Sequence, residues 1–316
     1  MTDKILLCDL SLKGQLRAAL WEPIGGLGTI RVIKADNREQ FEAGVLAFLD
    51  DEGAPFLRAA AMAAPGWEHD GVQHMPNHGY DLERERLRQV FNVQRIHIVN
   101  PTVARAMAIP HLKPGDCEIF NTGDDIHDQA KCVIGTGPGL GMAMLVPDNW
   151  GQWAAYCGAG GHSDLATATE REQDLLQLLT AKYGHVSRER VVSLGGIGDI
   201  WAALGTLDHA AEAEPLPAPE IVAMAQAGDS RAREAVELCV TFLARAASDM
   251  ALIVGARGGV YLTGELMDLL DGQIDRDHFR RTFSGKGRLS DYLEAVPIYN
   301  LKSSDCEFNG LATLFA

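Results

Sequence analysis

The sequence predicts an α/β protein with two lobes. Its 316 residues, 47% of them hydrophobic, are enough for two domains that each have a core. Apolar segments of strand character alternate with segments of helical period along the chain. A polar, turn-rich stretch at 116–128 follows Pro110 and marks the entry into the second lobe. We therefore expect a small lobe over 1–110, rejoined by a terminal helix over 303–316, and a large lobe over 111–302.

The first lobe is predicted to open with a strand hairpin, KILLCDL followed by QLRAALWEP. Helical period then alternates with apolar strand segments up to the helix that Pro110 stops. Arginines and glutamates interleave on DLERERLRQVF, which we interpret as a solvated helix face. The predicted segments are strands at 4–10, 15–23, 56–65 and 95–100 and helices at 38–51, 81–91 and 102–110.

The second lobe is predicted to begin with a strand, a glycine turn and a second strand, in the segment CVIGTGPGLGMAMLV. Thr169 and Glu172 have the spacing of a capping box, and Gly184 ends the helix that they open. Ser187 is placed to cap the next helix start. The segments that follow are a loop leading into a helix at 214–230, a long helix at 233–255, a buried strand at 258–266, and a strand, loop and terminal helix over 296–316.

Composition excludes several function classes. The formal net charge of −15 repels phosphate backbones and anionic headgroups, so we expect neither nucleic acid nor a membrane as the main partner. No cleavable signal pattern opens the chain and charges interrupt its apolar stretches, which predicts a cytoplasmic protein. The six scattered cysteines, and a polar loop containing His69, His74 and His78, do not have the spacing of a metal site. We therefore expect a small-molecule partner and no metal-ligand cluster.

Four glycines recur in one short stretch, at Gly135, Gly137, Gly139 and Gly141. Glycine lets backbone N–H groups approach a phosphate closely, so the run is a candidate nucleotide loop. It lacks the Gly-Lys-Ser/Thr ending of a P-loop, and a strand rather than the helix of a dinucleotide fingerprint follows it. By itself the run is equally well explained as a tight β-hairpin.

The order and spacing of several motifs resemble those of bacterial glucokinases over essentially the whole chain. The motifs are the Asp-containing opening strand and hairpin, an Asn-ended strand before MAIP, IGTGPGLG, GAGGHSD, GHVSRERVVS and GGVYLTGEL. The resemblance implies an actin-like (ribonuclease H-like) sugar kinase fold with a cleft between two lobes. It also implies a homodimer that transfers the γ-phosphoryl group of ATP, with Mg²⁺, to the 6-hydroxyl of glucose.

On the sugar side, the resemblance assigns the general base to the residue after Asn100, where this chain has Pro101. Proline has no ionisable group and no N–H, so it can neither deprotonate nor hold the sugar. A glutamate of the family is replaced by Ala159, whereas His162 and Glu189 remain as implied sugar contacts. Asn100 is equally well explained as a turn residue before proline, His162 as part of a capped turn, and Glu189 by a helix dipole.

On the phosphate side, the family's Asp-x-Gly-Gly-Thr-Asn is represented by Asp9 and the residues that follow it. Ser11 and Leu12 replace the two glycines, so the cradle is expected to be closed, although Lys13 offers a compensating charge. Pro138 stands where the family has threonine in the second loop. Gly264 is kept in the nucleotide segment, but Glu265 replaces a glycine there and adds a negative charge that disfavours phosphate.

Two hypotheses of different class remain from the sequence. In the first, the chain is a catalytically impaired relative that serves as a sugar sensor or regulator. In the second, it is an active glucokinase or hexose kinase whose base is another acid, such as Asp164, Asp116 or Asp9.

Overall fold

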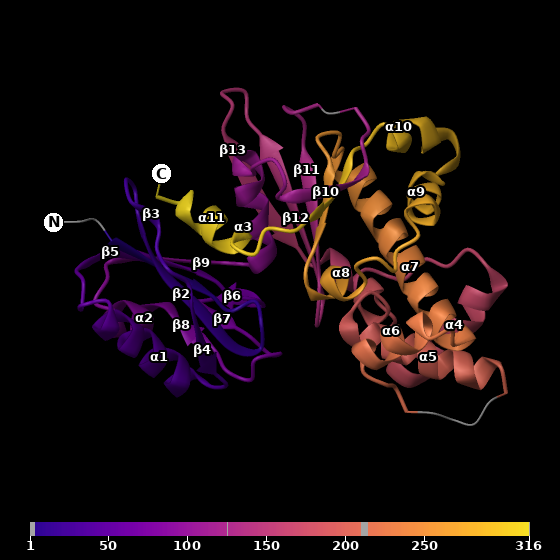
Figure 1. The fold of residues 1–316 in the computed structure, drawn as a ribbon, viewed down its shortest axis with the longest axis horizontal. Helices are drawn as coiled ribbons and strands as arrows, with labels where there is room; N and C mark the ends of the chain where they lie inside the picture. Colours follow the sequence, from indigo (N-terminus) through magenta and orange to yellow (C-terminus); the bar gives the residue numbers. More distant parts are fainter. Residues whose placement is uncertain (1–3, 125, 210–213, 316) are drawn as a thin grey trace. The chain divides into compact units, whose positions relative to one another are not determined.

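The computed structural model describes residues 4–124, 126–209 and 214–315 and divides the chain into two compact units. Unit 1 comprises residues 1–113 and 303–316, and unit 2 comprises residues 114–302. The chain leaves unit 1 once and returns to it through the terminal helix, drawn in yellow in Figure 1. None of the helices in the described residues is long and apolar enough to span a membrane.

Unit 1 is built on a mixed sheet with the strand order β3-β2-β1-β5-β9, in which β4 also pairs with β2. β1 pairs antiparallel with β2 and parallel with β5, and β5 pairs parallel with β9. A separate small sheet has the order β6-β7-β8. The elements are β1 (Lys4–Asp9), β2 (Gly14–Glu22), β3 (Gly26–Leu27), β4 (Arg31–Ala35), α1 (Arg38–Asp51), β5 (Leu57–Ala63), β6 (Trp67–His69), β7 (Val72–His74), β8 (Leu82–Glu83), α2 (Arg84–Val90), β9 (Arg95–Val99), α3 (Pro101–Ala108), the 3₁₀ turn η1 (Ile109–His111) and α11 (Cys306–Ala312).

The two faces of this sheet bury alternate residues, as the period of a strand requires. Leu6 and Cys8 of β1 belong to a core that they share with residues of α1 and α2. Ile5 and Leu7 belong to a second core that contains Phe308 of α11. Figure 1 accordingly shows α1 and α2 on one side of the sheet and α3 and α11 on the other. Residues of β1 are therefore buried on both faces.

Unit 2 contains a second mixed sheet, with the strand order β10-β15-β14-β11-β12-β13. The long α7 packs on the sheet at β11, and α5 packs on α7 in the same core. The elements are β10 (Cys117–Asn121), β11 (Lys131–Thr136), β12 (Leu140–Pro147), β13 (Trp153–Gly158), η2 (Gly160–His162), α4 (Glu170–Tyr183), η3 (Arg188–Arg190), α5 (Leu194–Leu207), α6 (Ala218–Gln226), α7 (Ser230–Val254), β14 (Val260–Thr263), α8 (Glu265–Leu269), α9 (Arg276–Ser284), η4 (Gly287–Leu289), α10 (Ser290–Glu294) and β15 (Ile298–Leu301).

Several local predictions differ from the structure. The stretch 116–128 contains the strand β10, which pairs antiparallel with β15, so reading it as turns alone is wrong; Asp125 lies outside the described residues. The helix predicted at 81–91 begins only at Arg84, because Leu82 and Glu83 pair with β7. Ser187 precedes a 3₁₀ turn rather than a helix, and its side chain makes no capping bond.

The helix α5 is absent from the sequence prediction. Glycine disfavours helix by about 1 kcal/mol relative to alanine, and this segment opens with three glycines within five residues. Packing explains two of them. A Cβ on Gly196 would lie 2.7 Å from the Val191 backbone, and one on Gly198 would lie 2.5 Å from the Leu216 carbonyl oxygen. Tertiary contacts therefore outweigh the local preference.

Candidate functional site

The glycine run joins β11 to β12 in unit 2 as a tight hairpin. Gly135 and Gly141 face each other within the strand ladder, whereas Gly137 and Gly139 lie in the turn. The Gly137 N–H donates to the Gly139 carbonyl at 3.0 Å, and the N–H of Leu194 at the start of α5 donates to the Gly137 carbonyl at 2.8 Å. Gly135 and Gly141 thus belong to the ladder, and both backbone groups of Gly137 are engaged by the chain itself. Of the four glycines, Gly139 has the N–H that lies outside these bonds.

Glu189, in η3, lies against this turn. Its Oε2 accepts the backbone N–H of Leu140 at 2.9 Å. A Cβ on Gly139 would lie only 2.8 Å from the same oxygen, so glycine at this position lets the carboxylate approach. The Nε2 of His162 lies 4.0 Å from Glu189 Oε2. The structure therefore brings together the two implied sugar contacts of unit 2, beside the glycine turn.

The short turn that contains His162 packs directly on β12. A Cβ on Gly161 would lie 2.1 Å from the Leu140 carbonyl oxygen, so glycine is needed for this approach. Ala159 precedes the turn, is exposed, and accepts the His162 N–H at 2.9 Å through its carbonyl. Its methyl group offers no hydrogen-bond acceptor. The His162 side chain is 66% exposed, so its ring is open to a ligand from solvent.

A second carboxylate lies beside the same glycine turn. Gly264 has a φ of 105°, and a Cβ there would lie 2.0 Å from the Thr136 carbonyl oxygen, so glycine allows the end of β14 to meet the end of β11. Glu265 follows, and its Oε2 lies 3.4 Å from the position of a Cβ built on Gly137. Glu189 and Glu265 thus both border the turn, and their negative charges disfavour an anion there.

In unit 1, Asp9 and Asn100 lie at the same edge of the sheet. Asp9 and Val99 are both register partners of Ala63, which places the carboxyl ends of β1, β5 and β9 together. Ligands of α/β sheets bind at such edges. The Asn100 Oδ1 accepts the N–H of Thr102 at 2.9 Å and so caps α3.

Pro101 is the first residue of α3 and is buried. Proline suits this position because the first N–H groups of a helix have no partner within the helix and because its φ is already helical. Asn100 and Pro101 together are therefore a good helix start. They leave no ionisable group at the position where the family resemblance assigns the general base.

Asp9 is 2% exposed and surrounded by donors. Its Oδ1 accepts the backbone N–H of Ser11 at 2.9 Å and also the Ser11 hydroxyl, while its Oδ2 accepts Arg17 Nε at 2.7 Å. Burial raises the pKa of Asp9, and the neighbouring Glu307 carboxylate adds to the rise, while Arg17 and Ser11 oppose it. Both Asp9 oxygens are thus occupied by groups of the chain itself.

Arg17 continues this pairing to the terminal helix, in a chain of alternating charges that we call the buried ion network (Asp9, Arg17, Glu307 and Arg105). Arg17 donates to Glu307 Oε2 at 2.9 Å, and Arg105 of α3 donates to Glu307 Oε1 at 2.7 Å. Burial opposes ionisation of Glu307, but Arg105 and Arg17 together hold its pKa below the usual value.

Sequence reasoning missed three members of the buried ion network. The signal for Arg17 is the hairpin register, which places it directly opposite Asp9, since cross-strand neighbours of opposite charge attract. Glu307 and Arg105 lie 202 positions apart, and no local pattern joins them.

The β1–β2 turn after Asp9 is closed by the polypeptide. Leu10 is fully buried, and its carbonyl oxygen lies 2.9 Å from Nε2 of the buried His78. The Gln15 N–H donates to the Leu12 carbonyl at 3.2 Å. Lys13 is exposed. The turn therefore has a partly exposed Leu12 side chain and several engaged backbone groups where the family resemblance expects a phosphate cradle.

The other acids considered as substitute bases lie in unit 2. The Asp164 carboxylate pairs with His185 at 2.8 Å and is 94% exposed. The Asp116 carbonyl accepts the Lys302 N–H at 2.7 Å beside the start of β10. The third, Asp9, is held by Arg17 and Ser11 as described above.

Comparison with known proteins identifies the family. A protein-family model described as Glucokinase matches residues 16–316. The chain is 34% identical over 301 residues to a glucokinase of Chromobacterium violaceum, which covers 95% of this chain and 86% of the relative. The chain belongs to the glucokinase family. The family resemblance and the predicted actin-like α/β fold are thereby confirmed.

Other glucokinase-family proteins agree with this assignment. A glucokinase-like protein of Caulobacter vibrioides is 34% identical over 275 residues, covering 87% of this chain and 85% of that protein. The crystal structure of a glucokinase from an Antarctic psychrotroph superposes with a TM-score of 0.85 at 25% identity, covering 99% of both chains. The matched region of the glucokinase family begins at Leu16, so it leaves out the segment from Asp9 to Gln15 where the first phosphate loop is expected.

The β1–β2 turn does not fit Mg–ATP. A magnesium ion requires free oxygen ligands in octahedral geometry, whereas both Asp9 oxygens already accept hydrogen bonds and a guanidinium lies 2.5 Å from one of them. Within the described residues no group of three or more His, Cys, Asp or Glu side chains is placed to hold a metal ion. The Leu12 side chain stands in the turn, and the N–H groups of Ser11 and Gln15 already donate to the chain, so fewer backbone donors are left for a phosphate than in a glycine cradle.

Proposed function

We propose that this glucokinase-family protein binds a glucose-like sugar but is impaired in phosphoryl transfer to it. The observation that supports this most strongly is Pro101 at the first position of α3, directly after Asn100. Similar enzymes use a carboxylate there to take the proton of the 6-hydroxyl. Loss of a general base alone costs about 10²–10⁴ in rate.

The phosphoryl-donor side supports the same proposal. In place of a glycine cradle, the β1–β2 turn has Leu12, and Asp9, the acid that the family resemblance places before the cradle, is paired with Arg17. ATP and Mg²⁺ are the cofactors of the family activity, and this chain therefore lacks one of the two loops expected to bind them. The hairpin at Gly137 and Gly139 remains for a nucleotide, but Glu265 beside it weakens binding of a phosphate.

The sugar side is better preserved. Glu189 and His162 lie 4.0 Å apart beside the glycine turn, and Asn100 ends β9 at an edge suited to ligands. The carboxylates missing at positions 101 and 159 would each have contributed about 1.5–3 kcal/mol, or together about 10²–10⁴ in affinity if they add. We therefore expect millimolar binding of glucose and a role as a sugar sensor or regulator, in the homodimer that the family suggests.

An active glucokinase with a substitute base is the second candidate. Family membership over residues 16–316 favours it, because fold and most motifs are kept. Of the three acids considered, Asp9 is the least suited, since Arg17 and Ser11 already occupy its carboxylate. This candidate therefore depends on Asp164 or Asp116.

A coupled assay of ATP and glucose turnover, with calorimetry of glucose binding, separates the two candidates. Impaired transfer predicts turnover far below the ordinary value of about 10 per second together with weak glucose binding. Turnover near that value would contradict the proposal. If Asp164→Asn and Asp116→Asn leave such turnover unchanged, the substitute-base candidate also fails.

A further inference from the structure

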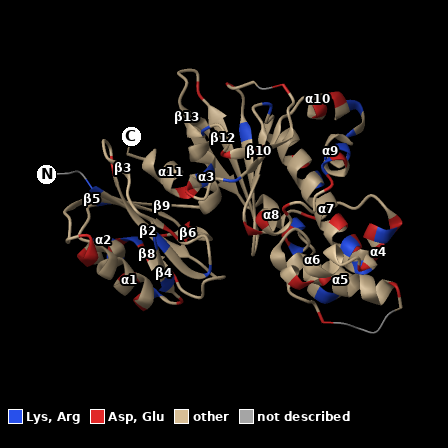
Figure 2. Cartoon of the chain, in the orientation of Figure 1, with Lys and Arg blue, Asp and Glu red and all other residues tan. Residues whose placement is uncertain are grey.

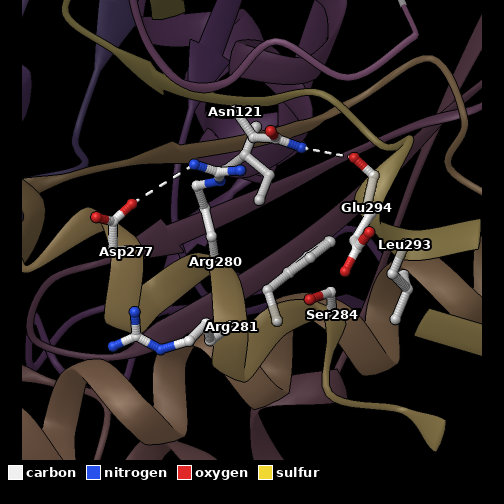
Figure 3. Close-up of a pocket in the computed structure, with 9 residues that line it drawn as sticks. Asn121, Asp277, Arg280, Arg281, Ser284, Leu293 and Glu294 are labelled. Atoms are coloured by element: carbon white, nitrogen blue, oxygen red, sulfur yellow. Dashed lines mark hydrogen bonds and ion pairs between the residues drawn. The ribbon is translucent and has the colours of Figure 1, made fainter. Parts of the chain in front are cut away.

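Unit 2 contains a pocket of about 380 Å³ that the candidate sugar site does not use (Figure 3). It lies between α9 and α10 and the adjoining ends of β10 and β15. It shares no residue with the glycine turn, which belongs to β11 and β12, and β14 separates β15 from β11 in the sheet. Its volume is in the range of pockets that bind one small molecule. The lining residues are Asn121, Asp277, Arg280, Arg281, Phe283, Ser284, Leu293, Glu294 and Ile298.

The floor of the pocket is apolar and fixed. Phe283, Leu293 and Ile298 line it, each is at most 1% exposed, and all three belong to the main core of unit 2. Close packing in a core holds such side chains in single rotamers. The floor therefore offers a preformed surface to the carbon skeleton of a ligand.

One side of the pocket is cationic. Arg280 pairs with Asp277 at 3.5 Å, but the side chains are 52% and 75% exposed, and such a surface pair is worth about 0–1 kcal/mol. The Arg281 side chain forms no ion pair within the described residues, although the pKa of Asp275, which backbone N–H donors lower, is lowered further by the Arg281 charge. A ligand anion can thus replace Asp277 on Arg280 at little cost, and Arg281 adds positive charge to this side of the pocket.

The basic character of α9 is local. The helix has three arginines and one aspartate, in a chain whose net charge is −15. Figure 2 shows positions of basic and of acidic residues in both α9 and α10. Guanidinium groups bind phosphate through paired N–H donors, so Arg280, with the charge of Arg281 on the same helix, favours a phosphate group.

The opposite side offers hydrogen-bond acceptors. The Glu294 carboxylate forms no ion pair within the described part of the chain, and Figure 3 shows it directed toward Ser284, across the pocket from Arg280. Asn121 Nδ2 donates to the carbonyl oxygens of Glu294 at 3.0 Å and Val296 at 2.9 Å, which fixes this rim to β10. An ionised carboxylate only accepts, so it requires donors such as hydroxyl groups.

We propose that this pocket binds a small phosphate ester of a hydroxylated carbon skeleton. The phosphate group lies on Arg280 and Arg281, the hydroxyl groups donate to Glu294 and hydrogen-bond Ser284, and the skeleton covers the floor at Ile298. An α-amino acid fits less well, because its ammonium and carboxylate groups are attached to the same carbon atom, whereas Arg280 and Glu294 lie on opposite sides of the pocket.

Calorimetry with glucose 6-phosphate as the probe tests the proposal. To keep the candidate sugar site out of the measurement, the experiment uses Glu189→Gln as the background. We expect binding that Arg280→Ala with Arg281→Ala weakens at least about tenfold, and that Glu294→Gln weakens less. Arg288→Ala, an exposed arginine of η4 outside the pocket, is the matched control and should leave the affinity unchanged.

Each other outcome overturns a stated part of the proposal. If the probe does not bind at millimolar concentration, or if the Arg280 and Arg281 substitutions do not change its affinity, the pocket is not a binding site for it. Equal affinity for inorganic phosphate removes the role of the hydroxyl groups and of Glu294. If leucine, as a representative α-amino acid, binds more strongly than glucose 6-phosphate, the proposed class of ligand is wrong. Because the probe and the pocket variants differ from those of the glucose assay, this result stands independently of the proposed function.

Discussion

Glu189 accepts the backbone N–H of Leu140 at 2.9 Å, so one carboxylate both holds the glycine hairpin and faces the candidate sugar site. The oxygen that makes this bond also lies 4.0 Å from His162 Nε2. The side chain is 30% exposed, which leaves part of it open to a ligand. The proposed sugar contact and a structural contact therefore fall on one residue, and substitutions can separate them.

Replacing Glu189 by glutamine and by alanine should separate these two roles. Glutamine keeps an oxygen that can accept from Leu140, so we expect unfolding free energy within about 0.5 kcal/mol of the original. Alanine loses a charge-assisted hydrogen bond and should cost about 1.5–3 kcal/mol. Both changes should weaken glucose binding in calorimetry. Unchanged glucose affinity in both variants would remove Glu189 from the sugar site.

Pro101→Asp alone should not create a glucokinase of ordinary activity. A base accelerates only a reaction whose phosphoryl donor is already positioned, and the β1–β2 turn does not hold one. The measurement is turnover with ATP and glucose, with folding checked by circular dichroism. Full turnover in the single variant would mean that proline is the only defect.

Combining Pro101→Asp with Ala159→Glu, Ser11→Gly and Leu12→Gly should give more than the product of the separate gains. Groups that act as one catalytic unit are strongly non-additive, because each is useful only when the others are in place. The assay is the same turnover measurement on the single, paired and combined variants. Purely multiplicative gains would contradict the idea of one dismantled site.

Glu307→Ala should destabilise the protein by about 3–5 kcal/mol, because it leaves Arg17 and Arg105 buried without their shared carboxylate. Urea unfolding measures the change. Glu85→Ala is the matched control, since Glu85 pairs with Arg88 at the surface and is 72% exposed, and it should cost at most about 1 kcal/mol. Equal effects of the two substitutions would show that the buried ion network does not stabilise unit 1.

His78 should make stability depend on pH below neutrality. Burial lowers the pKa of His78 from its usual value of 6.5, so the unfolded chain takes up a proton before the folded protein does. Stability is therefore fully present above pH 6.5 and falls as the pH drops toward the lowered value. Unfolding free energies measured between pH 7.5 and 5 should show a smaller fall in His78→Gln. His69→Gln, a change at an exposed histidine, should keep the original slope.

Gly310→Ala should be strongly destabilising, whereas Gly195→Ala should not. Gly310 lets α11 approach α3 so closely that a Cβ would lie 1.7 Å from the Ala104 carbonyl oxygen. A Cβ on Gly195, near the start of α5, would have no heavy atom within 4 Å. Thermal unfolding should show a large loss for the first and a change within about 0.5 kcal/mol for the second. Similar effects would argue against close packing of α3 on α11.

Hydrophobic period and turn chemistry predicted most elements from the sequence. The helix α1 occupies the predicted 38–51, and Thr169 accepts the Glu172 N–H at 3.2 Å as the capping box requires. Strand β10 was missed because it pairs with β15, far along the chain. Helix α5 was missed because its glycines disfavour helix locally, and their close packing on Val191 and Leu216 is visible only in the folded chain.

The sequence by itself determined the family, most of the elements and the presence of proline after Asn100, since these depend only on residue types and their spacing. Only the tertiary structure showed that Arg105 pairs with Glu307, that Glu189 accepts the Leu140 N–H, and that Arg280 faces Glu294 across a pocket. Contacts between residues far apart in the chain have no local signature. They arise when the chain buries apolar surface and the remaining charges must find partners in the folded geometry.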